Sequence, residues 1–264
     1  MAITLILAGL AAALSAAMAA AWLVVERTGR SGWADATWSA SVGVTGVAAA
    51  LAPFAHGITT RQIIVATLVG LWSLRLGGHI VARTRKGGDD PRYQALKEEW
   101  GPDRRRRLFW FLQVQAAAAF LLLLTILIAA HNPAPWPRLG DLLGIAVAFA
   151  AIVGEAVADR QLAQFRRKAA NRGQVCDTGL WGWSRHPNYF FEWLGWVAYA
   201  LIAIDLAGGY PWGWLALAGP AFMYWLLVHV SGIPPLEAHM LRSRGDAFRA
   251  YQARVSAFWP RPGG

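Results

Sequence analysis

Residues 108–130 of the chain read LFWFLQVQAAAAFLLLLTILIAA, a run that contains no charged side chain. A helix needs roughly 20 apolar residues to cross the ~30 Å hydrocarbon core of a bilayer, so this run predicts a membrane-spanning helix. The runs are continuous and do not alternate as the strands of a membrane barrel would. Comparable runs lie at 3–25, 33–55, 62–83, 139–159, 188–205 and 211–231. The sequence therefore predicts an all-α integral membrane protein of about seven transmembrane helices.

The distribution of Lys and Arg predicts the orientation of these helices, because cytoplasmic loops retain positive residues. The loop after 62–83 carries nine, the loop after 139–159 carries six and the tail carries five, whereas the loops after 33–55, 108–130 and 188–205 carry one, one and none. We expect the N-terminus outside and the tail, 235–264, in the cytoplasm of a bacterium, with the protein in its inner membrane. Topology and anionic lipid then account for the net charge of +10, and no nucleic acid is expected as a partner.

The whole chain is interpreted as a single membrane domain, with the first run retained as a helix. That run is longer than the apolar region of a signal peptide, and no positive segment precedes it. Cys176 is the single cysteine, so neither an intrachain disulfide nor a cysteine-based metal cluster is expected, and we predict no metal site. Tryptophans near the ends of the predicted helices indicate an interfacial aromatic belt, namely Trp33, Trp110, Trp136, Trp181, Trp183 and Trp212.

Polar side chains inside membrane segments are costly, and each is a hypothesis about a site or pathway. Asp35 lies just inside the second segment, either as a first-turn carboxylate favoured by the helix dipole or as a group that handles protons. Arg75 and His79 share one face of the third segment, four residues apart. Arg75 is interpreted either as the partner of Asp35 or Glu155 in an ion pair or, with His79, as part of a substrate cavity.

The end of the fifth segment carries Glu155, Asp159 and Arg166, whose spacing places them on one face of a continuing helix. Carboxylates accept hydrogens from ribose or amide groups, and arginine binds phosphate in a bidentate manner. The three residues therefore fit a ligand with hydroxyl-rich and phosphate-rich parts. The alternative interpretation is a solvated helix end whose charges pair with one another.

A second polar group follows, in the sequence Arg185-His186-Pro187-Asn188-Tyr189 that leads to Glu192. Pro187 is suited to the first helical position, so Arg185 and His186 are expected beside a helix N-terminus, which attracts anions. Asn188 and Glu192 are again four residues apart. The two polar faces could enclose a nucleotide at the membrane surface. The basic tail, which includes Arg244, could lie along the headgroups or fold over this site as a lid.

The stretch from Gly179 to Glu192, together with Tyr251 to Pro260, resembles the steroid 5-alpha reductase superfamily and, more narrowly, its branch of uncharacterised bacterial membrane proteins. The resemblance implies a seven-helix bundle that uses NADPH to reduce a carbon–carbon double bond conjugated to a ketone. It also implies cofactor contacts for Glu155, Asp159, Arg166, Asn188 and Glu192, although Glu155 stands where the family has asparagine. Asp35 is the nearest counterpart of the family's ketone-binding glutamate.

Isoprenylcysteine carboxyl methyltransferases, which use S-adenosylmethionine, are similar in the Arg-His-Pro-x-Tyr element and in the tail. Asp159 and Arg166 keep the spacing of the reductases, and Asn188 and Glu192 keep their pair at the start of the sixth segment, so the resemblance to the reductases implies NADPH. We therefore expect a reductase of a lipophilic enone. Arg166, Arg185 and Arg244 would hold the phosphates of the cofactor, and His186 would also contact it. Asp35 or Tyr189 would be the acid that polarises the carbonyl of the substrate. A methyltransferase and a non-catalytic protein that binds lipid or a partner helix are the alternatives.

Overall fold

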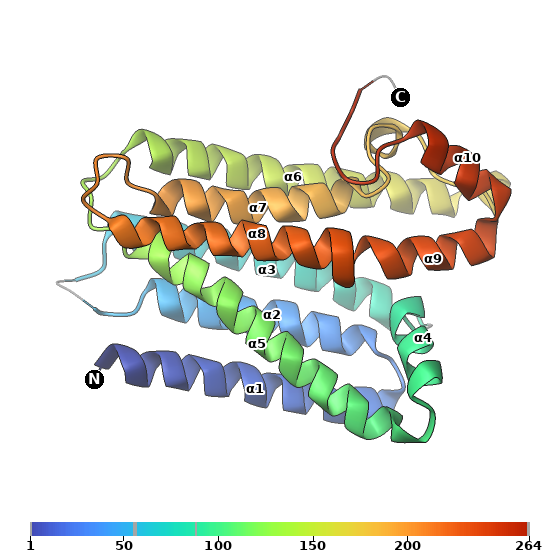
Figure 1. The fold of residues 1–264 in the computed structure, drawn as a ribbon, viewed down its shortest axis with the longest axis horizontal. Coiled ribbons are helices and arrows are strands. Elements are labelled where there is room, and N and C mark those ends of the chain that lie inside the picture. Colours follow the sequence, from blue (N-terminus) through green and yellow to red (C-terminus); the bar gives the residue numbers. More distant parts are fainter. Residues whose placement is uncertain (1, 55–56, 88, 263–264) are drawn as a thin grey trace. The chain divides into compact units, whose positions relative to one another are not determined.

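The computed structural model describes residues 2–54, 57–87 and 89–262, and these residues form helices and turns but no β-strand. The predicted all-α fold is confirmed. Residue 55, at the end of the segment expected at 33–55, and residues 263–264 of the tail lie outside the described residues. Figure 1 shows the helices. They belong to two compact units. Unit 1 comprises Met1–Gly144 and Tyr199–Gly219, and unit 2 comprises Ile145–Ala198 and Pro220–Gly264.

Unit 1 is built around α2, which packs against α1, α3 and α5 (Figure 1). Glycines on α2 allow a close approach to α3, because a Cβ added at Gly43 would overlap the side chain of Ser73, and one added at Gly32 would overlap Thr84. Small residues serve this purpose at contacts between membrane helices. The main helices of unit 1 are α1 (Ala2–Thr28), α2 (Gly32–Ala50), α3 (Thr60–Arg85), α4 (Pro91–Trp100) and α5 (Arg104–Ala130).

One end of unit 1 is held by a buried ionic network, called here the Arg61 network (Arg61, Asn132, Arg138, Asp141 and Asp205). Arg61 is 3% exposed and binds Asp141 through two hydrogen bonds, Nε to Oδ1 at 2.9 Å and Nη2 to Oδ2 at 2.8 Å. Arg138 contacts Asp141 and also lies 3.5 Å from Asp205. The two arginines of the weakly basic loops are therefore neutralised within the protein.

Unit 2 contains most of α6 (Leu139–Arg167), α7 (Pro187–Ala203) and α8 (Ala218–Trp225), followed by α9 (Ile233–Arg244) and α10 (Asp246–Arg254). A π-helical turn, η5 (Leu226–Val230), follows α8, and α9 then begins with two prolines in its first turn. Pro187 is the first residue of α7, which confirms the position predicted for it. The helix expected at 139–159 continues to Arg167, so Glu155, Asp159 and Arg166 do share one helix.

Helices that are long and apolar enough to cross a membrane support the expectation of a membrane protein. The segment expected at 211–231 is divided into η4 (Pro211–Leu217), a 3-10 helix, then α8 and η5. The segments expected at 33–55 and 188–205 form α2 and α7, which have 19 and 17 residues. In the described part of the chain, five candidate spans meet the length and hydropathy requirement: Ile3–Thr28, Thr60–Arg85, Pro91–Ala130, Leu139–Arg167 and Pro211–Arg244.

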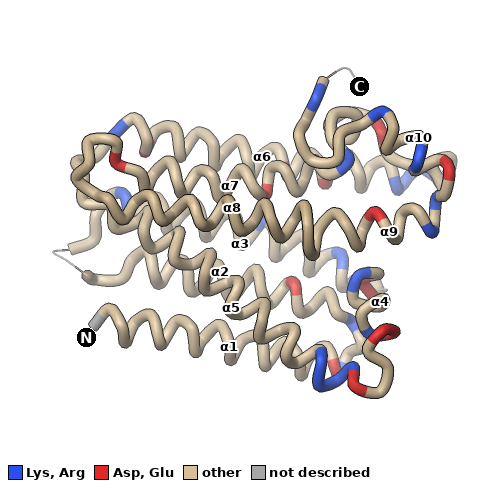
Figure 2. Tube along the Cα trace, viewed as in Figure 1, with Lys and Arg blue, Asp and Glu red and all other residues tan. Residues whose placement is uncertain are grey.

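Charged residues are concentrated at particular helix ends in each unit (Figure 2). In unit 1 they gather where α1 and α3 end and where α5 begins, with Arg27, Arg85 and Arg104 as examples. In unit 2 they lie at the end of α6 and along α9 and α10. The long apolar middles of α1 and α5 carry none, as expected for helices that lie in hydrocarbon.

Candidate functional site

Helices α6 and α7, which carry the two predicted polar faces, are in close contact in unit 2. A Cβ added at Gly154 would overlap the ring of Phe191, and one added at Gly195 would lie 3.8 Å from the Cβ of Ala151. Glycine therefore permits α7 to approach α6 at this level. Because Glu155 follows Gly154 and Glu192 follows Phe191, the contact carries two acidic residues into the same part of unit 2.

Both carboxylates are buried, which is costly unless a partner compensates for the lost hydration. Glu155 is 5% exposed and Glu192 is 8% exposed. Glu192 accepts a 3.0 Å hydrogen bond from Nε1 of Trp196, one turn further along α7. Asp159 is half-buried and Arg166 is exposed. The structure thus places the two acids inside unit 2 and the predicted phosphate-binding arginine at its surface.

Asn188 has a buried acceptor that the described residues leave unmatched. Its Oδ1 atom makes no hydrogen bond within the described part of the chain, although Asn188 lies on the same face of α7 as Glu192. An unsatisfied buried polar atom costs about 1–3 kcal/mol, and more than nine in ten buried polar groups have a partner. An N–H group of a ligand would remove this cost.

The element that precedes α7 is fixed by ionic contacts called here the Arg185 network (Arg185, His186, Glu237 and Gln252). Arg185 donates to both oxygens of Glu237, from Nε at 2.7 Å and from Nη2 at 3.2 Å. Its remaining nitrogen, Nη1, donates to the carbonyl oxygens of Gln252 and Val255. Each guanidinium nitrogen of Arg185 therefore already has an acceptor within the protein. Arg185 was expected to bind a phosphate, and in this structure it binds Glu237 and main-chain carbonyls instead.

His186 joins the same carboxylate, with its Nε2 2.9 Å from Oε1 of Glu237. The side chain is almost fully buried, and burial lowers the pKa of His186 despite the opposing effect of Glu237. The neutral imidazole donates its Nε2 hydrogen to the carboxylate. Tyr189, one of the two predicted acids, stacks on this imidazole with ring centres 5.4 Å apart.

The last residues of the tail fold back on the segment before α7. Residues 255–261, called here the C-terminal strap, run beside residues 183–185. The main-chain N–H of Arg185 donates to the carbonyl of Ser256 at 2.8 Å, and that of Arg261 donates to the carbonyl of Trp183 at 2.9 Å. The hydroxyl of Ser184 donates to the carbonyl of Phe258 at 2.9 Å.

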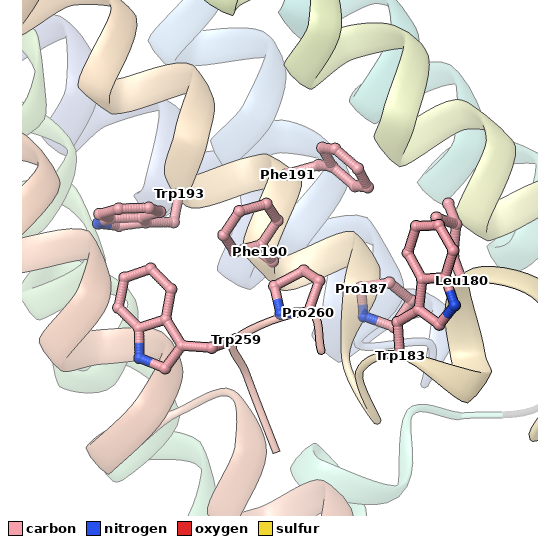
Figure 3. Close-up of a pocket in the computed structure, with 8 residues that line it drawn as sticks. All are labelled: Leu180, Trp183, Pro187, Phe190, Phe191, Trp193, Trp259 and Pro260. Carbon is pink, nitrogen blue, oxygen red and sulfur yellow. The ribbon is translucent and has the colours of Figure 1, made fainter. Parts of the chain in front are cut away.

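A pocket of about 340 Å³ lies between the strap, the start of α7 and the short turn before it (Figure 3). Aromatic rings, prolines and one leucine form its walls, which carry no charged or amide side chain. It is called here the aromatic pocket, and it is lined by Leu180, Trp183, Pro187, Phe190, Phe191, Trp193, Trp259 and Pro260.

Asp35, the other predicted acid, belongs to a separate cluster in unit 1. Its Oδ2 accepts a 2.7 Å hydrogen bond from Arg92, and its Oδ1 accepts one of 2.8 Å from the hydroxyl of Tyr93. Gln115 donates to the same hydroxyl at 3.0 Å. Sequence reasoning did not assign a role to Tyr93 or Gln115. The signal available was the loop Asp89-Asp90-Pro91-Arg92-Tyr93, where Asp90 caps α4 by accepting from the N–H of Arg92.

The remaining predicted residues are divided between the units. Arg75 is half-buried and His79 is exposed, and both lie on α3 in unit 1 with Asp35. Arg244 ends α9 in unit 2, and its buried Nε atom has no hydrogen-bond partner among the described residues. The predicted cofactor residues therefore all belong to unit 2, and the predicted substrate-cavity residues belong to unit 1.

Comparison with known proteins gives a family for this chain. A family model described as a protein of unknown function, DUF1295, matches residues 21–255. The chain belongs to the DUF1295 family. An uncharacterized protein of Schizosaccharomyces pombe is 32% identical to this DUF1295 protein over 88 residues, which cover 32% of the chain and 23% of the yeast protein. No solved structure matches this chain.

Proposed function

We propose that this DUF1295 protein is a membrane-embedded reductase that uses NADPH to reduce a carbon–carbon double bond conjugated to a ketone in a lipophilic substrate. The observation that carries the proposal is the buried, unmatched acceptor of Asn188, which lies on the face of α7 that also carries Glu192. The association of the DUF1295 family with steroid 5-alpha reductase-like membrane proteins supports it.

The residues of unit 2 fit the chemical groups of this cofactor. Oδ1 of Asn188 can accept a hydrogen from a carboxamide, and the carboxylates of Glu155, Asp159 and Glu192 can accept hydrogens from ribose or amide groups. Arg166 is the proposed phosphate ligand because its side chain is exposed at the end of α6, and Arg244 is the second. When bound, NADPH supplies a hydride to the β-carbon of the enone.

The acid that polarises the ketone is proposed from the geometry of the two candidates. Asp35 accepts hydrogen bonds from Arg92 and Tyr93, so its carboxylate acts there as an acceptor. The hydroxyl of Tyr93 carries the proton of that pair, and Asp35 and Gln115 fix its position. Asp35 is therefore proposed to act through Tyr93, and Tyr189 remains the alternative donor in unit 2. General acids of this type contribute about 10²–10⁴-fold to a rate.

The proposed topology is seven transmembrane helices with the N-terminus outside and the cofactor site on the cytoplasmic side of a bacterial inner membrane. Helices α2 and α7 rise by about 28 Å and about 25 Å, close to the thickness of the hydrocarbon core. The strongly basic loops and tail support the orientation. A lipophilic substrate would then enter from the bilayer.

One observation favours a second candidate, an S-adenosylmethionine-dependent methyltransferase. The Arg-His-Pro-x-Tyr element and the acidic residue of the tail, which resemble that enzyme class, are joined in the Arg185 network through Glu237. Such a protein would bind S-adenosylmethionine in place of NADPH.

Thermal unfolding of the purified protein in detergent separates these candidates. A ligand that binds only the folded state at 100 times its Kd stabilises it by about 2.7 kcal/mol, so NADPH should raise the Tm and S-adenosylmethionine should not. Asn188→Ala and Arg166→Ala should remove the NADPH shift. Gln164→Ala and Arg167→Ala, which alter exposed residues of α6 next to Arg166, should retain it. A shift with S-adenosylmethionine alone would favour the methyltransferase, and no shift with either ligand would favour the non-catalytic alternative.

A further inference from the structure

The aromatic pocket lies on a different face of α7 from the residues of the proposed cofactor site. An α-helix turns by about 100° per residue, so Phe190 and Trp193 project from α7 at roughly 100–160° from Asn188 and Glu192, and Phe191 lies between the two faces. The pocket is therefore separate from the unmatched acceptor of Asn188.

The walls of the pocket select an apolar occupant. Trp259 and Pro260 of the C-terminal strap lie opposite Phe190 and Trp193 of α7 (Figure 3). Water in a hollow needs two to four polar partners, and these side chains offer almost none. A flexible hydrocarbon chain would instead bury apolar surface against both the helix and the strap.

The mouth of the pocket combines exposed tryptophans with a positive charge. Trp183 and Trp259 are 44% and 43% exposed, and tryptophan is enriched where a membrane meets water. Arg261 follows Pro260, and its main-chain N–H is hydrogen-bonded to the carbonyl of Trp183 at 2.9 Å, which fixes the arginine next to the pocket. Its side chain is exposed, and no carboxylate among the described residues pairs with it.

We propose that the aromatic pocket binds one acyl chain of an anionic phospholipid whose phosphate contacts Arg261. This pairing places the apolar part of the lipid against the rings and its charge against the arginine. The basic residues of α9 and α10 would draw anionic lipid towards this part of unit 2. A lipid bound there would contact both α7 and the strap, and would hold the strap in place. The proposal does not depend on the identity of the cofactor.

Native mass spectrometry of the detergent-purified protein with dioleoyl phosphatidylglycerol tests the site. We expect one lipid per chain to remain bound under conditions that remove the others. Trp183→Ala removes one wall and should weaken this binding by at least about tenfold. Arg261→Gln keeps the main-chain hydrogen bond and should weaken it by about fivefold. Dioleoyl phosphatidylcholine, which has the same chains without net charge, should bind more weakly and be insensitive to Arg261→Gln.

Matched variants control for general effects on lipid binding. Trp212→Ala removes an exposed tryptophan of η4 in unit 1, and Arg27→Gln removes an exposed charge at the end of α1 in the same unit. Both should bind phosphatidylglycerol within about twofold of the unaltered protein. Equal retention of lipid by all four variants would overturn the proposal. So would a dimer that is lost in Trp183→Ala, because a second copy of the chain would then occupy the pocket.

Discussion

The Arg61 network of unit 1 and the Arg185 network of unit 2 are built from the same kind of ion pair, but an unmatched buried acceptor lies near the second. In each, an arginine binds both oxygens of a carboxylate and also donates to main-chain carbonyls. The Arg61 network combines two arginines with two aspartates and is largely buried at one end of unit 1. The Arg185 network is followed three residues later by Asn188, whose buried acceptor is unmatched. The contacts within the Arg61 network are explained by structure alone, whereas the unmatched buried atom of Asn188 is the observation on which the proposed ligand rests.

The largest expected effect is the loss of Asp141. Asp141→Ala leaves Arg61 buried without its carboxylate, and breaking a buried ion pair in this way costs about 3–5 kcal/mol. We expect a large fall in the Tm of the detergent-solubilised protein. Asp246→Ala, which removes an exposed partner of Arg249, is the control and should change the stability by less than about 1 kcal/mol. Equal shifts would show that the Arg61 network does not hold unit 1 together.

A smaller effect is expected from Glu237→Gln in the Arg185 network. The amide keeps one acceptor but loses the charge that binds Arg185 and His186, at a cost of about 1.5–3 kcal/mol for charge-assisted hydrogen bonds. The strap should then be cleaved faster in limited proteolysis. Glu99→Gln, an exposed change on α4, should leave the cleavage rate unaltered. Unchanged protection of the strap in Glu237→Gln would separate the Arg185 network from the folding of the tail.

One buried or half-buried histidine in each unit, His131 in unit 1 and His186 in unit 2, should make the stability of the protein depend on pH. Burial lowers the pKa of both His131 and His186, so the unfolded chain takes up protons that the folded chain does not. Stability should therefore fall as the pH drops below about 6.5, by at most about 1.4 kcal/mol per pH unit for the almost fully buried His186.

Tm measurements between pH 5 and 8 on His186→Gln and His131→Gln assign this slope. We expect the loss at low pH to be reduced more by His186→Gln, because the imidazole of His131 is less completely buried. A slope that neither substitution changes would mean that other groups control the acid sensitivity of the protein.

The smallest expected effect on stability is that of Asn188→Leu. Replacing an unmatched buried acceptor by an apolar side chain of similar size should be nearly neutral, or stabilise by up to about 1 kcal/mol. The NADPH shift in Tm should nevertheless disappear. A large loss of stability would show that Asn188 is already satisfied and would remove the main contrast between the two networks.

Much of the fold could be predicted from the sequence because the length of an apolar run sets where a membrane helix can form. The helix that contains residues 108–130 begins only four residues earlier, at Arg104, and Pro187 begins α7 as its fixed φ angle favours. Helix α4 was not predicted, because it has ten residues and a polar composition. Short polar helices carry no hydrophobic period that a sequence can reveal.

The candidate site was predictable only where its residues are close in sequence. The spacing of Glu155 with Asp159 and of Asn188 with Glu192 indicated shared helix faces, and α6 and α7 provide them. The partner of Arg185 is 52 residues away, and Arg61 binds Asp141 across 80 residues. Pairs at such separations depend on tertiary packing, which local periodicity does not encode.

The C-terminal strap contacts residues 183–185 mainly through its main chain, so these contacts depend little on the side chains of the strap. At Ser256 and Phe258 it contributes only main-chain carbonyls to its contacts with Ser184 and Arg185, and at Arg261 it contributes a main-chain N–H. Most side chains at 256 would preserve these bonds, whereas Ser184 and Arg185 contribute their side chains as well. A saturation mutagenesis scan should therefore find 256 and 257 permissive and 184 and 185 restrictive. The main-chain hydrogen bond of position 261 should be kept by every residue except proline, which lacks the N–H, whereas the proposed phosphate contact should require the arginine side chain.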